Sequence, residues 1–230
     1  MVKNHLKRLA APRSWPIRRK EKKFITKANP GMHSLEQGMP LSIFVKDVLG
    51  YAKTGREVKK ILQDKEVAVD CVRRKDYRFS VGLMDSLGFH EIKKYYRVAL
   101  DKKGKLSLVE IKKEEASIKP CKITGKSKFK GKIQLNLFDG RNILVDKDDY
   151  RVNDTIIVSL PKQEIKKHIK FEKNAAVFLT GGAHIGNTGV VEDIVGDKIR
   201  YKSSDGNVFE TLKKYAFVLG REKPEIRIEK

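Results

Sequence analysis

The chain is poor in cysteine, since its 230 residues include only Cys71 and Cys121. Two cysteines are too few for a disulfide framework, and these two lack the close paired spacing of zinc ligands. The five histidines are scattered, with no pair four residues apart. We therefore expect reduced thiols in a cytoplasmic protein that has no metal and no cofactor.

Long hydrophobic runs are also missing. No segment approaches the ~18 consecutive apolar residues of a membrane-spanning helix, and the basic segments lack the continuous apolar stripe of a membrane-surface helix. The first residues carry charge without a hydrophobic core, which is not typical of a secretory signal. We expect no membrane partner and no secretion.

Acidic residues are strongly outnumbered. The 51 Lys and Arg residues exceed the 29 Asp and Glu residues, which gives a formal net charge of +22. This charge is larger than solubility requires and indicates a polyanionic partner, with nucleic acid as the first candidate. The 40% hydrophobic content is sufficient for one large or two to three small folded domains.

Residues 41–76 have the most regular pattern in the chain. Thr54 and Glu57 form a Thr-x-x-Glu capping box, which predicts a helix that begins at Gly55. Apolar side chains at helical spacing define one face of this helix. The opposite face carries the cations Arg56, Lys59 and Lys60. A basic helix face can equally be a solvated surface, and periodicity alone does not decide between the two interpretations.

The segment that follows this helix is predicted to be a strand. In VAVDCV the side chains of Val67, Val69 and Cys71 should point to one side. The strand would bring three cations next to the helix, where they could grip a phosphate backbone: Arg73, Arg74 and Lys75.

Residues 1–40 are rich in cations and contain four prolines, so a continuous helix is excluded. We expect an arm that becomes ordered against a partner rather than a packed domain. Trp15 and Phe24 lie among the cations, and such rings stack on unpaired RNA bases. For Trp15, anchoring of the arm on a domain is the alternative that we favour.

Strands dominate the remainder. Hairpins are predicted for residues 95–111, for residues 132–145 around Asp139-Gly140, and for residues 198–212 around Asp205-Gly206. A strand at 155–160 and short strands on either side of a glycine-rich loop complete the pattern. We expect a central β-rich barrel or sandwich.

The sequence Thr124-Gly-Lys-Ser127 is similar to part of a nucleotide-binding P-loop, but Pro120 replaces the required first glycine. We therefore interpret it as a cationic loop suited to phosphate backbone, with Lys126, Lys128 and Lys130. The alternative is a mobile basic loop without a partner.

Two segments resemble known RNA-binding modules. Residues 173–199, with Gly182, Ile185-Gly186, Thr188-Gly189 and Val190-Val191, resemble the KOW motif of small SH3-like barrels. Residues 41–76 resemble the S-four RNA-binding domain. Together with the basic arm, this order of modules resembles the archaeal and eukaryotic S-four-e family of small-subunit ribosomal proteins, and the shorter C-terminal tail resembles the archaeal members.

The resemblance implies an α+β multidomain fold. It would comprise a basic arm (1–40), a small helical and strand S-four-type RNA-binding unit (41–105), a central β-rich domain (106–170), a C-terminal SH3-like β-barrel with the KOW motif (171–222) and a charged tail (223–230). The KOW loop departs from the pattern, because Ala183, His184 and Asn187 stand where lysine is common. We therefore expect the main phosphate contacts at Arg56, Lys59, Lys60 and Arg73 to Lys75.

The resemblance also implies a structural constituent of the small ribosomal subunit, without catalysis, that supports translation and contacts small-subunit ribosomal RNA and neighbouring ribosomal proteins, with no small-molecule substrate. An RNA-modifying enzyme and a KOW-type transcription elongation factor are the alternatives. The candidate RNA-binding residues are Lys7, Arg8, Arg13, Trp15, Arg18, Arg19, Lys53, Arg56, Lys59, Lys60, Arg73, Arg74, Lys75, Lys126, Lys128, Lys130, Gly182, His184 and Asn187.

Overall fold

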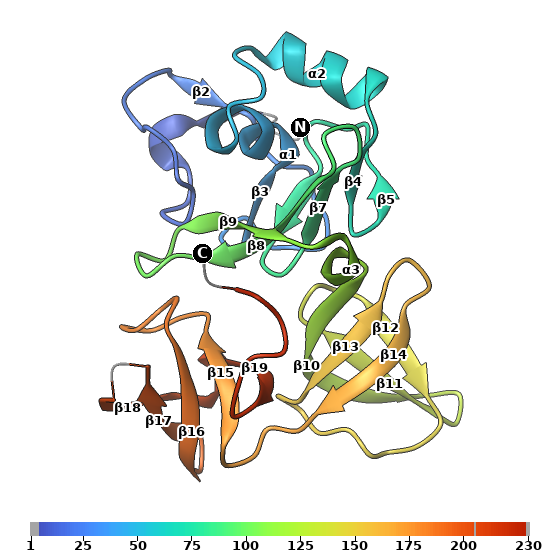
Figure 1. Ribbon diagram of the computed structural model, residues 1–230, viewed down its shortest axis with the longest axis vertical. Coiled ribbons are helices and arrows are strands. Elements are labelled where there is room, and N and C mark those ends of the chain that lie inside the picture. Colours follow the sequence, from blue (N-terminus) through green and yellow to red (C-terminus); the bar gives the residue numbers. More distant parts are fainter. Residues whose placement is uncertain (1–4, 205, 229–230) are drawn as a thin grey trace. The chain divides into compact units, whose positions relative to one another are not determined.

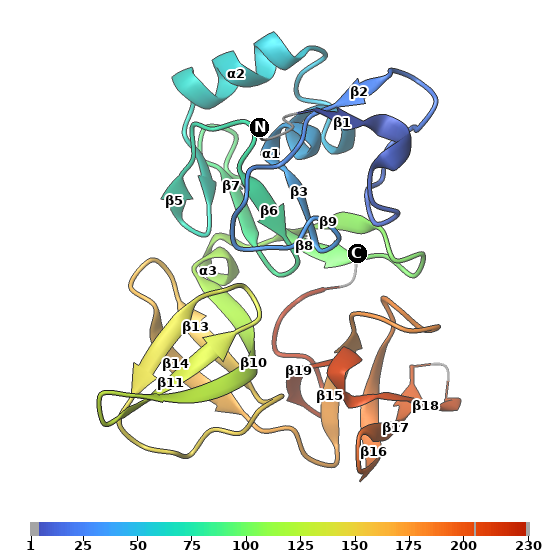
Figure 2. The same ribbon diagram turned by 180° about the vertical axis from the view of Figure 1, so that it is seen from behind.

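The computed structural model describes residues 5–204 and 206–228, which form two compact units (Figures 1 and 2). The first unit contains the chain up to Ala99 together with Lys105–Ser117, and the second contains Leu100–Gly104 and Ile118–Ile228. The β-rich, multidomain architecture predicted from the sequence is confirmed.

The first unit combines short helices with a five-stranded sheet of order β5-β4-β7-β8-β9 and a strand pair β3-β6. Its strands and helices are β1 (Leu6–Lys7), η1 (Arg8–Ala10), β2 (Phe24–Ile25), β3 (Gly38–Pro40), α1 (Leu41–Ile43), the π-helical turn η2 (Phe44–Val48), α2 (Gly55–Asp64), β4 (Val67–Val69), β5 (Val72–Arg73), β6 (Ser80–Gly82), β7 (Ser86–Phe89), β8 (Lys94–Leu100), β9 (Leu106–Ile111) and α3 (Lys113–Ala116). Helix α2 begins at the predicted residue, and its apolar face is buried through the side chains of Val58 and Leu62.

The basic arm is packed, which makes the prediction of an unpacked arm wrong for residues 5–40; residues 1–4 lie outside the described part. Trp15 is 1% exposed, and its indole N–H donates to the carbonyls of Leu35 (3.2 Å) and Gly38 (3.0 Å). Arg19 donates to the carbonyls of Ala11 and Pro12, both at 2.7 Å. The arm folds because its own cations and its tryptophan satisfy its backbone carbonyls.

The predicted 67–72 strand is interrupted. Asp70 and Cys71 both have positive φ (52° and 61°), so the chain turns between β4 and β5. The Asp70 carboxylate accepts a hydrogen bond from the Ser86 amide (3.0 Å), which holds this turn, and aspartate tolerates left-handed backbone better than most residues. Cys71 is exposed and does not share a face with the buried Val67 and Val69.

The second unit contains two five-stranded antiparallel sheets. The first has the order β12-β11-β10-β13-β14 and contains β10 (Ile118–Phe129), β11 (Lys132–Leu137), β12 (Asn142–Val145), β13 (Thr155–Ser159) and β14 (Glu164–Ile169). Strand β10 pairs with β13 through its first half and with β11 through its second, with a register shift between Ile123 and Gly125. This change of partner curves the sheet around a core that includes Cys121, Ile123 and Leu135.

The second sheet has the order β18-β17-β16-β15-β19. Its elements are β15 (Ala175–Leu179), β16 (Thr188–Val195), β17 (Lys198–Ser203), β18 (Val208–Leu212), the 3-10 turn η3 (Lys213–Tyr215) and β19 (Ala216–Arg221). The predicted 132–145 and 198–212 hairpins are present, although Asp205 of the second turn lies outside the described residues. Ile226 is 1% exposed and packs in the core of this unit, so the segment predicted to be a charged tail is partly buried.

Candidate nucleic-acid interface

A groove of about 600 Å³ crosses the first unit beside the start of helix α2. In both ribbon views, β2, α1 and α2 lie together at one end of this unit (Figures 1 and 2). The lining residues come from the arm, from α1 and η2, from the first turns of α2 and from the β5–β6 connection: Arg8, Lys22, Phe24, Ile25, Thr26, Ser42, Ile43, Lys46, Asp47, Thr54, Gly55, Arg56, Val58, Lys59 and Tyr77.

The first turn of α2 is fixed by its capping box. Thr54 Oγ1 accepts from the Glu57 amide (3.3 Å), and Glu57 Oε2 accepts from the Lys53 amide (2.7 Å). The Thr54 hydroxyl also donates to Glu57 Oε1 (2.9 Å), and the hydrogen bonds that the Glu57 carboxylate accepts, first from the Lys53 amide and then from this hydroxyl, lower its pKa. Gly55 has no neighbour within 4 Å of a side-chain position, so the N-terminus of α2 is open to the groove. The helix dipole favours an anion there.

The charge of the groove is strongly positive. Five cationic side chains line it, against the single carboxylate of Asp47, and Lys46 Nζ lies 3.7 Å from that carboxylate. Arg8 is 3% exposed and is held by a hydrogen bond from Nη1 to the Arg18 carbonyl (2.8 Å). The groove is therefore electrostatically complementary to a polyanion such as a nucleic-acid backbone.

Aromatic rings accompany these cations. Phe24 is 50% exposed, with Lys23 Nζ 5.5 Å from its ring centroid. The Tyr77 ring lies 4.7 Å from Lys59 Nζ. Exposed rings beside cations are the groups on which unpaired RNA bases stack.

The structure brings three of the predicted residues into one groove, namely Arg8, Arg56 and Lys59. Lys60 is exposed outside the groove lining. Arg73 Nη2 donates to the Gln63 carbonyl (2.9 Å) near the end of α2, and the Arg74 guanidinium lies 4.4 Å from the Phe79 ring. The expected placement next to the helix is confirmed for Arg73, whereas Arg74 contacts Phe79 outside the helix.

Other predicted residues have structural partners. The burial of Trp15 leaves no ring face for a base, so its prediction as a base-stacking residue is wrong and the anchoring alternative is correct. Lys126 is paired with Asp148 and donates to the Tyr150 carbonyl (2.6 Å). The His184 ring packs 4.1 Å from the Phe209 ring centroid.

The remaining predicted positions are found on the surface, apart from Arg19 described above and Asn187, which is partly buried. The exposed ones are Lys7, Arg13, Arg18, Lys53, Lys75, Lys128, Lys130 and Gly182.

Sequence reasoning missed four groove residues: Lys22, Phe24, Lys46 and Tyr77. Phe24 is predicted to be a stacking ring among the arm cations, although it is not among the candidate RNA-binding residues. Lys46 and Tyr77 belong to segments that meet the arm only in the folded chain, and no local pattern in the sequence links them.

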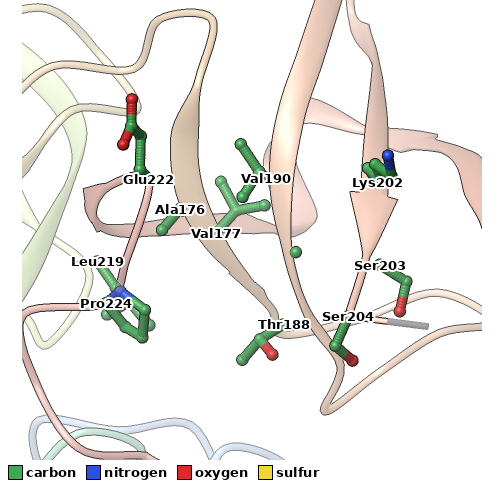
Figure 3. A pocket seen from close by; sticks show the side chains of 11 residues that line it. Ala176, Val177, Thr188, Val190, Lys202, Ser203, Ser204, Leu219, Glu222 and Pro224 are labelled. Carbon is green, nitrogen blue, oxygen red and sulfur yellow. The ribbon is translucent and has the colours of Figure 1, made fainter. Parts of the chain in front are cut away.

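A second hollow, of about 230 Å³, lies in the second unit (Figure 3). Small and apolar side chains such as Ala176, Val177 and Val190 form its wall, with the hydroxyls of Ser203 and Ser204 at one side. Among its lining residues Glu222 is the single carboxylate, and no histidine or cysteine accompanies it.

Residues 5–204 and 206–228 contain neither a candidate metal cluster nor a candidate membrane-spanning helix. No cluster of three or more His, Cys, Asp or Glu side chains with the spacing of a metal site occurs among them. Within the same residues, no helix has both the length and the apolar content needed to cross a membrane.

Comparisons with known proteins agree on one family. The family model described as "Ribosomal family S4e" matches residues 92–165, and the model of the RS4NT (NUC023) domain matches residues 2–36. The small ribosomal subunit protein eS4 of Methanosphaera stadtmanae is 43% identical, with 98% of this chain and 96% of that protein aligned. The eS4 protein of Methanocaldococcus jannaschii is 40% identical, with 98% of both chains aligned.

A solved structure is similar as well. The crystal structure of the 30S ribosomal protein S4e from Thermoplasma acidophilum matches with a TM-score of 0.70 at 30% sequence identity. The match covers 80% of this chain and 96% of that chain.

Proposed function

Because the chain belongs to the S4e family of ribosomal proteins, we propose that it binds small-subunit ribosomal RNA through the basic face of its first unit. It is a structural constituent of the small ribosomal subunit, without enzymatic activity, and it supports translation. The relatives carry ribosomal names, which favours this role over an RNA-modifying enzyme or a transcription elongation factor.

The observation that carries the proposal is the groove beside α2. It combines five cations, one carboxylate and an open helix N-terminus, all within the first unit. Lys and Arg side chains contact phosphate oxygens and neutralise their charge, which releases the ions condensed on the RNA. Such contacts fix the position of an RNA segment but do not read its sequence.

The proposed RNA contacts are the predicted residues that line the groove or are at least partly exposed, with Lys22 and Lys46 added from the groove. Trp15 is omitted because it is buried. Arg19, Lys126 and His184 are omitted because their side chains are partly buried against structural partners outside the groove. The proposed set is Lys7, Arg8, Arg13, Arg18, Lys22, Lys46, Lys53, Arg56, Lys59, Lys60, Arg73, Arg74, Lys75, Lys128, Lys130, Gly182 and Asn187.

The finer assignments belong to the same proposal. We propose that β15–β19 form an SH3-like barrel with the KOW motif, which the antiparallel order and the 3-10 turn η3 before β19 support. The five-part division with boundaries at residues 40, 105, 170 and 222 is kept as a proposal. Partners would be the ribosomal RNA and adjacent ribosomal proteins, in the cytoplasm.

The test compares two charge reversals in the full chain. We expect Arg56→Glu with Lys60→Glu to weaken binding to small-subunit rRNA fragments strongly and to reduce the salt slope by about two, because each lost phosphate contact removes about one. The matched control reverses two exposed cations near the C-terminus, Lys223→Glu with Arg227→Glu. Equal losses for the two pairs, or an affinity that does not depend on salt, would contradict the proposal.

A further inference from the structure

We infer that the groove beside α2 holds one unstacked nucleotide of a single-stranded RNA segment, with its phosphate at the N-terminus of α2 and its base on Phe24. This inference rests on the proposed RNA-binding function and specifies the form of RNA that this site takes. A phosphate backbone alone would need only exposed cations, but the groove contains three features beyond charge.

The first feature is a pair of buried polar groups among the residues that line the groove. Arg8 is 3% exposed and Ser42 is 6% exposed, and both line the groove. In the described part of the chain, neither Arg8 Nε nor Ser42 Oγ has a hydrogen-bond partner. A buried polar atom without a partner costs about 1–3 kcal/mol. Both atoms are sealed from the groove in the free chain, so a hydrogen bond to a ribose or a base edge requires a side-chain shift that opens them.

The second feature is the exposed ring of Phe24. Half of this large apolar side chain is exposed at a groove that is lined by both cationic and apolar side chains. A base stacked on the ring would cover it, and base–aromatic stacking tolerates any sequence because every base has a π-face. An acidic peptide would satisfy the cations but would leave this ring without a complementary surface.

The third feature is size. The groove volume of about 600 Å³ lies within the range of sites that bury a small molecule. Arg56 and Lys59 stand on the first turns of α2, where its dipole adds to their charge. A base that is paired in an A-form helix cannot leave its stack to enter such a groove, so the site should select single-stranded RNA.

The experiment measures the affinity of the full chain for a short uridine oligomer and for a blunt RNA duplex by fluorescence anisotropy. Phe24→Leu keeps the apolar bulk but removes the π-face, and we expect about a tenfold loss for the oligomer, equivalent to about 1.4 kcal/mol. Phe24→Trp should retain the oligomer affinity. Leu144→Ala, which truncates a side chain of the same 50% exposure outside the groove, should change neither affinity.

Ser42→Ala provides a second variant with an independent stability readout. Because Ser42 Oγ has no partner in the described structure, its removal should leave the free energy of unfolding unchanged or raise it, while the oligomer affinity falls several-fold. A variant that merely misfolds would lose stability and duplex binding together.

The outcomes separate this inference from the proposed function. Equal oligomer affinity for the wild type, Phe24→Leu and Ser42→Ala would overturn the nucleotide site, while salt-dependent duplex binding would leave the RNA-binding function intact. Failure of the wild type to bind either RNA would overturn both. A preference of the wild type for an acidic peptide over the oligomer would identify the groove as a protein site and overturn the inference.

Discussion

Lys122 is a buried ammonium group inside the second unit. Its side chain donates to the carbonyls of Ala216 (2.7 Å) and Lys214 (2.8 Å), so it joins β10 to the turn before β19. Burial, with a smaller contribution from the positive charge of Lys213, lowers the pKa of Lys122 from 10.5 to about 8. The carbonyls hold the lysine in place, but the charge is costly there.

We expect Lys122→Met to lower the free energy of unfolding at neutral pH by about 1–3 kcal/mol, because two buried carbonyls lose a donor. The pH dependence has a defined sign. The folded state binds fewer protons than the unfolded state between pH 8 and 10.5, so the wild type should gain stability relative to the variant across that window. Urea unfolding of both proteins at neutral and alkaline pH measures the difference between their unfolding free energies. A difference that stays the same at both pH values would contradict the lowered pKa of Lys122.

Trp15 and Phe24 are aromatic residues of the same arm with opposite predicted roles. Trp15→Phe keeps an apolar ring but removes the indole donor to two carbonyls, so we expect a loss of about 1–3 kcal/mol in unfolding free energy and no change in RNA affinity. Phe24→Leu should show the reverse pattern. Thermal unfolding and fluorescence anisotropy with RNA, measured on the same samples, distinguish the two roles. A lower RNA affinity of a folded Trp15→Phe variant would show that Trp15 stacks on RNA after all.

Helix α2 shows how far local sequence determines an element. Thr54 and Glu57 act within one turn, so their spacing correctly predicted that the helix begins at Gly55. The strand after this helix was predicted too long, because the alternation of apolar residues continues past Val69 in the sequence. In the structure the chain turns at Asp70, whose carboxylate is hydrogen-bonded to the amide of Ser86, sixteen residues away. Periodicity describes neighbours along the chain and cannot reveal such a partner.

The capping box gives a prediction for this helix. Thr54→Ala should lower the unfolding free energy by about 0.5–2 kcal/mol, because the Glu57 amide loses its acceptor. Thr54→Ser keeps the hydroxyl and is the matched control. Since the pKa of Glu57 is lowered in the folded chain, its contribution is present above the ordinary pKa of 4.5 and is lost at lower pH, and Glu57→Gln should lack this acid-side loss. Chemical denaturation against pH tests both statements.

The groove could be predicted only in part, because several of its residues come from distant segments that meet only in the folded chain. Arg56 and Lys59 follow from the helix face, whereas Lys46, Phe24 and Tyr77 reach the groove from three separate segments. The arm was expected to be unpacked because its net charge repels itself, but Arg19 and Trp15 bond to carbonyls that no sequence pattern assigns to them. Tertiary hydrogen bonds of this kind are invisible to composition.

Because of the net charge of +22, added salt should raise the stability of the free protein and lower its affinity for RNA. Repulsion among excess cations destabilises the compact free chain, and salt screens it within about 10 Å at moderate ionic strength. We therefore expect the urea midpoint of the free protein to rise with added monovalent salt, while RNA affinity falls over the same range. Buried pairs such as Lys119–Asp139 (3.0 Å) are screened little and should not reverse the trend.

The double variant Lys223→Glu with Arg227→Glu gives a matched control. Its two charge reversals lower the net charge by four, so its urea midpoint should rise less steeply with salt. A midpoint that falls with salt would mean that exposed pairs such as Lys65–Glu91 (2.7 Å) outweigh the repulsion. Saturating RNA supplies the missing anions, so in its presence the midpoint should be higher at low salt and should lose its rise with salt. Urea titrations at two ionic strengths, with and without RNA, distinguish these cases.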